Sequence, residues 1–260
     1  MTATEALYVY GVVPEATHPG LFADVEGIAG GRSVRLVEAK GVAAIVSPVP
    51  LGDFEEEALE QHLRDPAWLE EKVRAHDRVL AAAVGRVTVL PLRFGSIYRG
   101  EDHVRTMLAE RDELADDLVR LDGLEELGVK ALLDTSVLRG RLESARGADV
   151  AAGSGRAYML RKGFERELDA EVRTFAATCA DESHARLAAA SVAARANPTQ
   201  APEVAGGDMI LNGAYLVRFD AEEKLRSAVA ELAARYGDDG VSYELTGPWP
   251  PYNFVEEGET

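Results

Sequence analysis

The side chains best suited to catalysis and metal binding are scattered along this sequence. Its five histidines stand at positions 18, 62, 76, 103 and 184, and they form neither an HExxH motif nor an i, i+4 pair on a predicted helix. Cys179 is the single cysteine, which excludes an intramolecular disulfide and any cysteine-based zinc or iron–sulfur cluster. The sequence therefore predicts no metal site.

Two of these residues lie on apolar faces of predicted helices, where packing and chemistry are alternative explanations. His76 shares a helical stripe with Leu69, Val73, Leu80 and Val84. A buried histidine with a hydrogen-bond partner is favoured over a catalytic one, because no serine or cysteine with a nucleophile's local signature accompanies it. Cys179 is interpreted as a small apolar residue rather than a reactive thiol. We therefore expect no enzyme, with no catalytic residue and no cofactor.

Phosphate and cation sites have only weak signals. Glycine-rich stretches occur at 27–31 and 153–155, but neither fits GxGxxG or GxxxxGK[ST], so turns are the favoured interpretation. Acidic groups at 55–57, 70–71 and 116–117 could bind divalent ions. Each group is contiguous on a predicted helix, so its members diverge around the helix axis and indicate a solvated face.

The composition is that of a folded protein with a strongly acidic surface. Of 260 residues, 47% are hydrophobic and 28% are charged, and 28 Lys and Arg against 45 Asp and Glu give a net charge of −17. Such a charge repels phosphate backbones and anionic lipids, so we expect neither nucleic acid nor membrane partners. The sequence contains no apolar run of the roughly 20 residues that cross a bilayer. No Lys or Arg precedes Arg32 to form the basic region of a secretory signal, so a soluble cytoplasmic protein is expected.

Hydrophobic periodicity predicts an N-terminal mixed α/β domain over residues 1–125. Apolar, β-branched segments predict strands at residues 6–13, 33–38, 42–47 and 87–98. Lys40-Gly41 can supply the tight reversal of a hairpin between the second and third strands. Pro48 and Pro50 are expected to end the third strand, because proline cannot donate to a ladder.

Two amphipathic helices complete this domain. Asp65 is the predicted N-cap of the first, with Pro66 in the first helical position and an end near Gly85. Glu101 and Asp102 begin the second, where negative charge favours the helix N-terminus. The apolar stripe of the second helix comprises Val104, Leu108, Leu114, Leu118 and Leu121.

The remaining residues, 126–260, predict a C-terminal ferredoxin-like plait of βαββαβ order, which makes the fold α+β with two domains. Strands are expected at residues 129–133, 209–219 and 241–245. The plait needs a fourth strand, which we expect within residues 184–199 against their helical propensity.

A long helix and a shorter one accompany these strands. The long helix spans about residues 154–181, and one face carries Leu160, Phe164, Leu168, Val172, Phe175 and Cys179. Asp220 and Glu223 form a predicted capping box that opens the second helix, which ends at Gly237.

The C-terminal segment LTGPWPPYNFV, residues 245–255, does not fit an ordinary strand. Its three prolines remove backbone donors and fix φ, and they alternate with Trp249, Tyr252 and Phe254. These aromatic residues either pack on the protein's own fold, which we favour, or form a candidate partner-binding site.

Several motifs in register resemble the gas vesicle protein GvpF/GvpL family. They are LYVYGVV near the N-terminus, AAIVSPVP after the hairpin, VLPLRFGS after the His76 helix, LGVKALLD at 127–134, GRAYMLRKGFE in the long helix, NGAYLV, and the terminal GPWPPYNFV. They cover nearly the whole chain, and GPWPPYNFV is the most specific.

This resemblance implies two α+β domains, the second ferredoxin-like, and a non-enzymatic accessory or minor structural protein of gas vesicle assembly. It implies contact with the gas vesicle shell protein and with other accessory proteins in the cytoplasm, but it establishes no single binding residue and no oligomeric state. The alternative is a small-molecule-binding or enzymatic ferredoxin-like module, which would need polar groups converging on a concave pocket. A nucleic-acid-binding plait is disfavoured by the charge and by the lack of an aromatic and basic RNA-binding signature.

Overall fold

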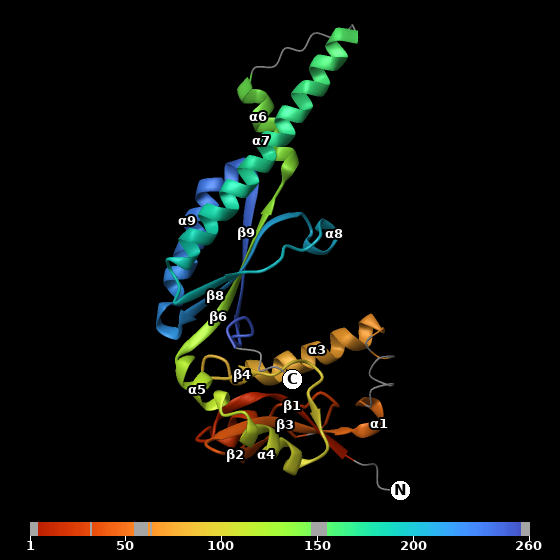
Figure 1. The fold of residues 1–260 in the computed structure, drawn as a ribbon, viewed down its shortest axis with the longest axis vertical. Helices are drawn as coiled ribbons and strands as arrows, with labels where there is room; N and C mark the ends of the chain where they lie inside the picture. Colours follow the sequence, from red (N-terminus) through yellow and green to blue (C-terminus); the bar gives the residue numbers. More distant parts are fainter. Residues whose placement is uncertain (1–4, 32, 55–61, 63, 147–154, 256–260) are drawn as a thin grey trace. The chain divides into compact units, whose positions relative to one another are not determined.

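The computed structural model describes residues 5–31, 33–54, 62, 64–146 and 155–255, which form two compact units (Figure 1). The first unit consists of the described residues of 1–126 together with those of 248–260, and the second consists of the described residues of 127–247. The chain passes between the units twice, within strands β6 (Leu124–Leu133) and β9 (Val241–Trp249). Among the described helices, none combines the length and the apolar character that a bilayer crossing requires.

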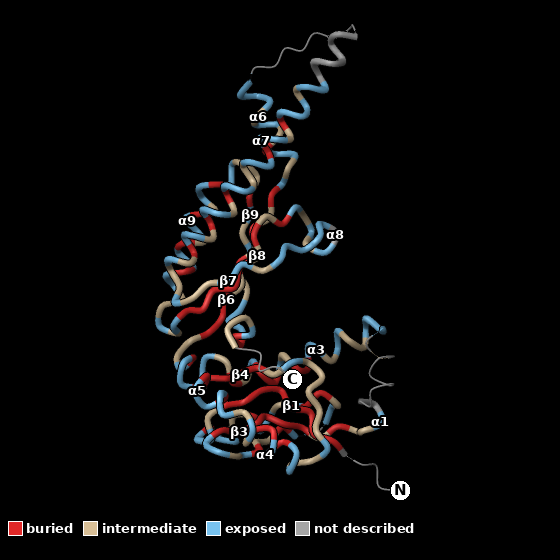
Figure 2. The backbone as a smooth tube through the Cα atoms, in the orientation of Figure 1, coloured by how far each residue is buried: buried red, intermediate tan, exposed pale blue. Residues whose placement is uncertain are grey.

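The first unit is built on a five-stranded antiparallel sheet in the order β2-β3-β1-β4, with β5 also paired to β1. The strands are β1 (Glu5–Pro14), β2 (Arg35–Ala39), β3 (Val42–Pro50), β4 (Leu90–Pro91) and β5 (Ile97–Tyr98). The side chains of β1 and β3 are almost wholly buried (Figure 2). They form the first core together with helix α3.

The predicted hairpin is confirmed, and its second strand is longer than expected. Lys40 (φ 48°) and Gly41 (φ 81°) both adopt the left-handed backbone conformation that a tight two-residue reversal requires. The expectation that Pro48 and Pro50 end the strand is wrong, because β1 pairs with β3 as far as Pro50. β2 pairs with β3 only as far as Val46, so Pro48 and Pro50 lie outside the β2–β3 ladder. Their missing N–H groups therefore remove no hydrogen bond between β2 and β3.

Helix α3 (Pro66–Ala81) begins as predicted, because the Asp65 carboxylate accepts hydrogen bonds from two amides of the first turn, at 3.0 and 3.4 Å. Its buried residues are Ala75, His76, Val79 and Leu80. Val73, a member of the predicted stripe, is exposed instead. A four-residue helix α1 (Leu51–Phe54) precedes α3 in the described part of the chain.

The helix predicted to start at Glu101 is two helices, α4 (Glu101–Glu110) and α5 (Glu113–Arg120). All five residues of the predicted apolar stripe are nevertheless buried. Helix α4 packs on β2 and β3, and α5 packs on β1 and β4. The stripe therefore identified the buried face correctly but not the break between the helices.

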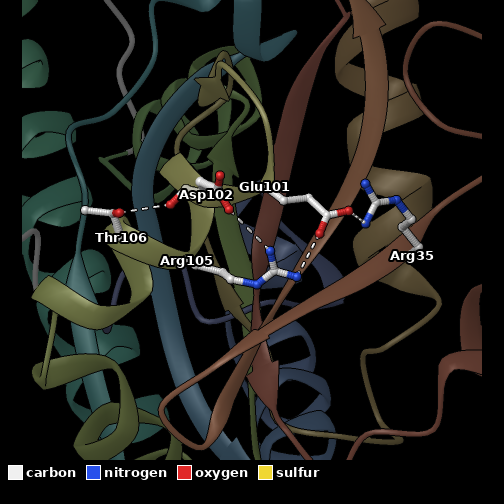
Figure 3. Close-up of polar contacts among 5 residues, drawn as sticks. All are labelled: Arg35, Glu101, Asp102, Arg105 and Thr106. Atoms are coloured by element: carbon white, nitrogen blue, oxygen red, sulfur yellow. Dashed lines mark hydrogen bonds and ion pairs between the residues drawn. The ribbon is translucent and has the colours of Figure 1, made fainter.

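Ion pairs attach the start of α4 to strand β2 (Figure 3). The Glu101 carboxylate lies 2.7 Å from Arg35 of β2 and 2.7 Å from Arg105, one turn further along α4. Asp102 lies 3.7 Å from Arg105. The neighbouring Arg35 charge is the main cause of a lowered Glu101 pKa. All four side chains are well exposed, so these pairs orient the helix and contribute little stability.

The second unit contains a four-stranded sheet in the order β7-β8-β6-β9. Its other strands are β7 (Ala193–Ala196) and β8 (Asp208–Arg218), which pair antiparallel. Helices α7 (Gly155–Ala188) and α9 (Glu222–Tyr236) lie along the sheet and share the second core with β6 and β8 (Figure 1). Helix α6 (Thr135–Arg146) packs on α7, and α8 (Pro202–Ala205) is a single turn before β8.

Several expectations for this unit need correction. The strand expected within residues 184–199 is confirmed but short, at Ala193–Ala196, and the predicted end of the long helix is wrong because α7 continues past residue 181 to Ala188. Helical propensity therefore prevails over the first part of that segment. The predicted capping box does not form, because Asp220 makes an ion pair with Arg218 at 3.1 Å and helix α9 has no side-chain cap.

The predicted apolar face of α7 is largely correct. Leu168, Val172 and Cys179 are buried, Phe164 and Phe175 are half-buried, and the side chain of Leu160 lies outside the described part. Phe164 packs under the guanidinium of Arg146 in α6 rather than in the second core. Phe164 is thus covered by helix α6, whereas Val172, Cys179 and Leu187 of the later turns belong to the second core.

Candidate partner-binding site

From Pro248 onward, the described residues of the C-terminal segment belong to the first unit, whereas the sequence analysis assigned the whole segment to the C-terminal domain. The backbone N–H and the side-chain amide of Asn253 donate to the two carboxylate oxygens of Glu126, at 2.8 and 2.6 Å. Arg120 Nη2 donates to the carbonyl oxygen of Phe254 at 2.9 Å. Glu126 is only 5% exposed, so its hydrogen bonds lie in a low-dielectric environment that strengthens them.

His76 is the third anchor and the centre of a buried polar network. Its Nδ1 lies 2.9 Å from the Tyr8 hydroxyl, and its Nε2 lies 3.2 Å from the Tyr252 hydroxyl. The Tyr8 hydroxyl accepts a hydrogen bond from the Gly95 amide at 3.1 Å. It can therefore donate its own proton to Nδ1, which leaves Nε2–H to donate to Tyr252. The expectation that His76 is buried with a hydrogen-bond partner is confirmed, since the residue is 3% exposed.

Burial keeps this network uncharged. It lowers the pKa of His76 to about 4 and raises the pKa values of Tyr8 and Tyr252 above that of an ordinary phenol. The imidazole and both phenols are therefore neutral at pH 7. A general base that works near neutral pH needs a pKa close to 7, so the network favours anchoring over proton transfer.

Aromatic rings and a close backbone approach hold the network in place. Phe94 packs against His76 with ring centroids 5.9 Å apart, and the Tyr8 and Tyr10 rings are 4.8 Å apart. A Cβ atom at Gly11 would lie 2.6 Å from the Leu90 carbonyl oxygen, so only glycine lets β1 approach β4 this closely. The motifs LYVYGVV, VLPLRFGS and GPWPPYNFV, far apart in the sequence, thus meet around His76.

The aromatic side chains of the anchored segment remain accessible. Trp249 is 40% exposed and Tyr252 is 42% exposed, whereas Phe254 is half-buried. The chain turns tightly after the buried Pro250, whose carbonyl accepts the Tyr252 amide at 2.7 Å. The hydroxyl of Tyr252 enters the network although the residue as a whole stays 42% exposed. A rigid backbone that presents accessible aromatic rings has the anatomy of a protein-binding hot spot.

The NGAYLV motif of the second unit has a structural role. The Tyr215 ring covers Gly213 so closely that a Cβ atom there would lie 2.4 Å from its hydroxyl oxygen. That hydroxyl lies 3.0 Å from His184 Nδ1 in α7, and the Asn212 side chain donates to the Pro198 carbonyl at 2.9 Å. The motif therefore joins strand β8 to its neighbouring helix and loop.

A hollow of about 430 Å³ in the second unit, with polar and apolar lining residues, is the strongest feature for the alternative, small-molecule function. Its wall includes Asp134, Ser136 and Asp208. The Asp134 carboxylate, however, accepts the amide and hydroxyl of Ser136 at 3.0 and 2.6 Å and the Val137 amide at 3.3 Å, which makes it the cap of α6. Asp208 is engaged by the Thr135 hydroxyl. These groups serve the fold rather than converging on a ligand.

The remaining candidates from the sequence also have structural partners. Cys179 is 1% exposed, and burial raises the pKa of its thiol, which makes it unreactive. Among the acidic groups, Glu70 pairs with Arg74 and Asp117 pairs with Arg120, while residues 55–57 lie outside the described residues. Within the described part of the chain, no group of three or more His, Cys, Asp or Glu side chains gathers to hold a metal ion.

Of the two glycine-rich stretches, the first lies entirely within the described part of the chain. Gly30 and Gly31 have φ values of 72° and 57°, the left-handed conformation of a turn. Gly153 lies outside the described residues. The first stretch is therefore a turn, as favoured from the sequence.

Sequence analysis named the aromatic residues of the segment but missed Glu126 and Arg120, which anchor it, and Tyr8, which binds the anchor residue His76. Glu126 gave a usable signal, because it belongs to a Glu-Glu pair inside the segment LEELGVKALL, whose other residues are apolar or glycine except Lys130. A carboxylate buried in a strand must have hydrogen-bond donors, and those donors had to come from elsewhere in the chain.

Comparisons with known proteins agree on one family. A family model described as gas vesicle synthesis protein GvpL/GvpF matches residues 6–256. The chain is 34% identical over 267 residues to gas vesicle protein L of a Streptomyces species, covering 98% of this chain and 94% of that protein. It is 28% identical over 257 residues to gas vesicle protein F1 of Halobacterium salinarum, covering 97% and 94% of the two chains.

Solved structures show the same fold. The crystal structure of the gas vesicle protein GvpF from Anabaena superposes with a TM-score of 0.72 at 18% identity, covering 98% of both chains. That of GvpF from Microcystis aeruginosa gives a TM-score of 0.68 at 21% identity, covering 97% of this chain and 99% of the other.

Proposed function

The chain belongs to the GvpL/GvpF family of gas vesicle synthesis proteins, and we propose that it is a non-enzymatic accessory protein of gas vesicle assembly. In this proposal it binds the gas vesicle shell protein through Trp249, Tyr252 and Phe254. It works in the cytoplasm, where vesicles form, alongside other gas vesicle accessory proteins.

One observation carries the assignment of the binding site. The segment that bears these aromatic side chains is anchored to the first unit by His76, Glu126 and Arg120, yet Trp249 and Tyr252 remain about two-fifths exposed. The anchors hold the backbone at Asn253 and Phe254 and the hydroxyl of Tyr252, and the exposed two-fifths of Trp249 and Tyr252 are the surface that we assign to a partner.

The chemistry of such binding is the burial of apolar area. A shell that excludes water on one side needs subunits with apolar faces, and a soluble accessory protein can cover such a face before assembly. Apolar area removed from water contributes about 25 cal/mol per Å². Two accessible aromatic side chains on a rigid backbone suit this role, because they supply a large contact area and lose little side-chain entropy on binding.

We also infer that the second unit is a ferredoxin-like plait. Its strands occur along the chain in the order β6, β7, β8, β9 and lie in the sheet in the order β7-β8-β6-β9, with long helices after β6 and β8. This is the strand order that a βαββαβ unit with antiparallel neighbours adopts. The resemblance supports the fold assignment and adds no catalytic role.

Capture of the shell protein from vesicle-forming cells tests the proposed function. The tagged full chain is expected to retain the shell protein, and Trp249→Ala is expected to reduce the captured amount severalfold while the chain remains folded, as shown by a cooperative thermal transition. Trp68→Ala removes the other tryptophan of the same unit, which stacks on His62, and it is the matched control. Failure of the unmodified chain to capture shell protein, or equal capture by Trp249→Ala, would contradict the proposal.

A further inference from the structure

Three basic side chains of helix α7 lie on one face of the helix. Lys162, Arg166 and Arg173 are all exposed. Their spacing of four and seven residues places them within about 40° of arc around the helix axis and along about 16 Å of its length. Among the described residues, none of the three has an ion-pair or hydrogen-bond partner. We call these three residues the α7 stripe.

The other basic side chains of the second unit are mostly engaged. Arg141 pairs with Asp239 at 2.7 Å, and Arg235 pairs with Glu182 at 2.9 Å. Among the described basic side chains of this unit, only Arg195 of β7 resembles the α7 stripe in lacking a hydrogen-bond or ion-pair partner. The unpaired positive charge of the described unit is therefore concentrated on one face of one helix.

The carboxylates next to the α7 stripe do not neutralise it. Asp169 pairs with an arginine of α6. Glu167 and Glu171 both pair with Arg146, at the end of the same helix. Glu165 is exposed, and within the described part of α7 it makes no ion pair with the stripe. The stripe therefore keeps its charge available for a partner with an acidic surface.

A second copy of this chain has an acidic surface of this kind. Residues 1–126 and 248–260, which make up the first unit, contain 13 Lys and Arg against 27 Asp and Glu, a net charge of −14. The second unit contains 15 against 18, a net charge of −3. Glu15, Asp24 and Glu26 follow β1 in a segment without Lys or Arg, and all three are exposed without an ion pair to any described residue. The first unit of one copy and the α7 stripe of another are thus complementary in charge.

We propose that the α7 stripe of one copy binds the acidic surface of the first unit of a second copy, so that copies associate head to tail. The two surfaces differ, so a bound pair still has one free stripe and one free acidic unit, and further copies can add. Exposed ion pairs are individually weak, so the association is reversible and sensitive to salt. It is independent of the binding of shell protein at Trp249.

Sedimentation equilibrium of the purified full chain tests this association. The apparent mass is expected to rise with protein concentration at low salt and to return to that of one chain at high salt. Arg166→Glu reverses one charge of the stripe and should raise the dissociation constant about tenfold. Arg195→Glu is the matched control, because it makes the same change at an exposed, unpaired arginine outside the stripe, and its effect should be less than about twofold. Melting temperature is recorded for both variants.

Cross-linking in a mixture of unlabelled and heavy-isotope-labelled chains locates the contact. A carbodiimide joins the amine of Lys162 to a carboxylate that lies against it. We expect peptides that contain one labelled and one unlabelled partner, linking Lys162 to the first unit of another copy.

Four results would overturn the inference. The first is a chain that has the mass of one copy at every concentration, and the second is an equal effect of Arg166→Glu and Arg195→Glu. The third is cross-links from Lys162 that stay within one chain. The fourth is a chain that stays monomeric while Arg166→Glu reduces its capture of the shell protein, which would assign the α7 stripe to that protein instead.

Discussion

Removing the Tyr252 hydroxyl is the most informative perturbation of the anchored segment. Tyr252→Phe deletes one oxygen atom and keeps the exposed ring, so any effect on folding comes from the bond to His76 at 3.2 Å. His76 is 3% exposed, so its Nε2 would be left buried without that partner. A neutral hydrogen bond contributes about 0.5–1.5 kcal/mol, and a buried polar group left unpaired costs about 1–3 kcal/mol. We expect Tyr252→Phe to lower the free energy of unfolding by about 1–2 kcal/mol.

Urea denaturation followed by tryptophan fluorescence is the appropriate assay. Both tryptophans, Trp68 and Trp249, belong to the first unit, so their emission reports on the unit that contains the anchor. Tyr98→Phe is the matched control, since it deletes the same hydroxyl from a residue of this unit whose hydroxyl has no hydrogen bond among the described residues. A double-mutant cycle between Tyr252→Phe and His76→Ala should give a coupling energy of about 1 kcal/mol.

Two results would refute this reasoning. One is a loss of stability in Tyr252→Phe no larger than that in Tyr98→Phe. The other is a coupling energy close to zero, which would mean that the two side chains contribute independently.

Three further predictions concern other parts of the structure. Burial lowers the pKa of His76 in the folded state to about 4, from 6.5. The contribution of the neutral imidazole to the free energy of unfolding is therefore fully present above pH 6.5, and up to about 3 kcal/mol of it is lost as the pH falls towards 4. His76→Phe should flatten the curve of stability against pH measured by urea denaturation. Gly213→Ala should lower the free energy of unfolding, measured by thermal denaturation, by about 1–3 kcal/mol, because the added Cβ would meet the Tyr215 ring. Gly163→Ala in α7 should instead stabilise the helix by up to about 1 kcal/mol, because a Cβ there meets nothing within 4 Å. Glu101→Gln should lower the free energy of unfolding by less than about 1 kcal/mol, and the difference should shrink in high salt; an effect that persists in high salt would contradict a surface ion-pair role.

The sequence was sufficient where local chemistry determines local structure. Lys40-Gly41 supplies the left-handed turn of the hairpin, Asp65 caps α3, and the apolar stripe that runs through Val104 marks the buried face of α4 and α5. Each of these features depends on residues within a few positions of one another.

Prediction failed where the deciding partner is distant. Pro48 and Pro50 remain in β3 because β2 is too short to reach them, which depends on the length of another strand. Helix α7 runs on through His184, whose side chain binds Tyr215 of β8, so the strand expected within residues 184–199 begins only at Ala193.

The candidate site could be predicted only in part for the same reason. Trp249, Tyr252 and Phe254 were recognisable from their alternation with prolines. Their attachment to the first unit depends on Glu126 and His76, which stand more than a hundred residues earlier in the chain. No local pattern connects those positions.

Site-specific photo-crosslinking at position 249 tests the central claim most directly. A photoreactive amino acid replaces Trp249 in the full chain inside vesicle-forming cells, and Trp68 is replaced in the same way as the control. The account predicts a cross-link from position 249 to the gas vesicle shell protein, and a far weaker one from position 68. Cross-links from position 249 that stay within this chain, while position 68 or neither position reaches the shell protein, would contradict the account.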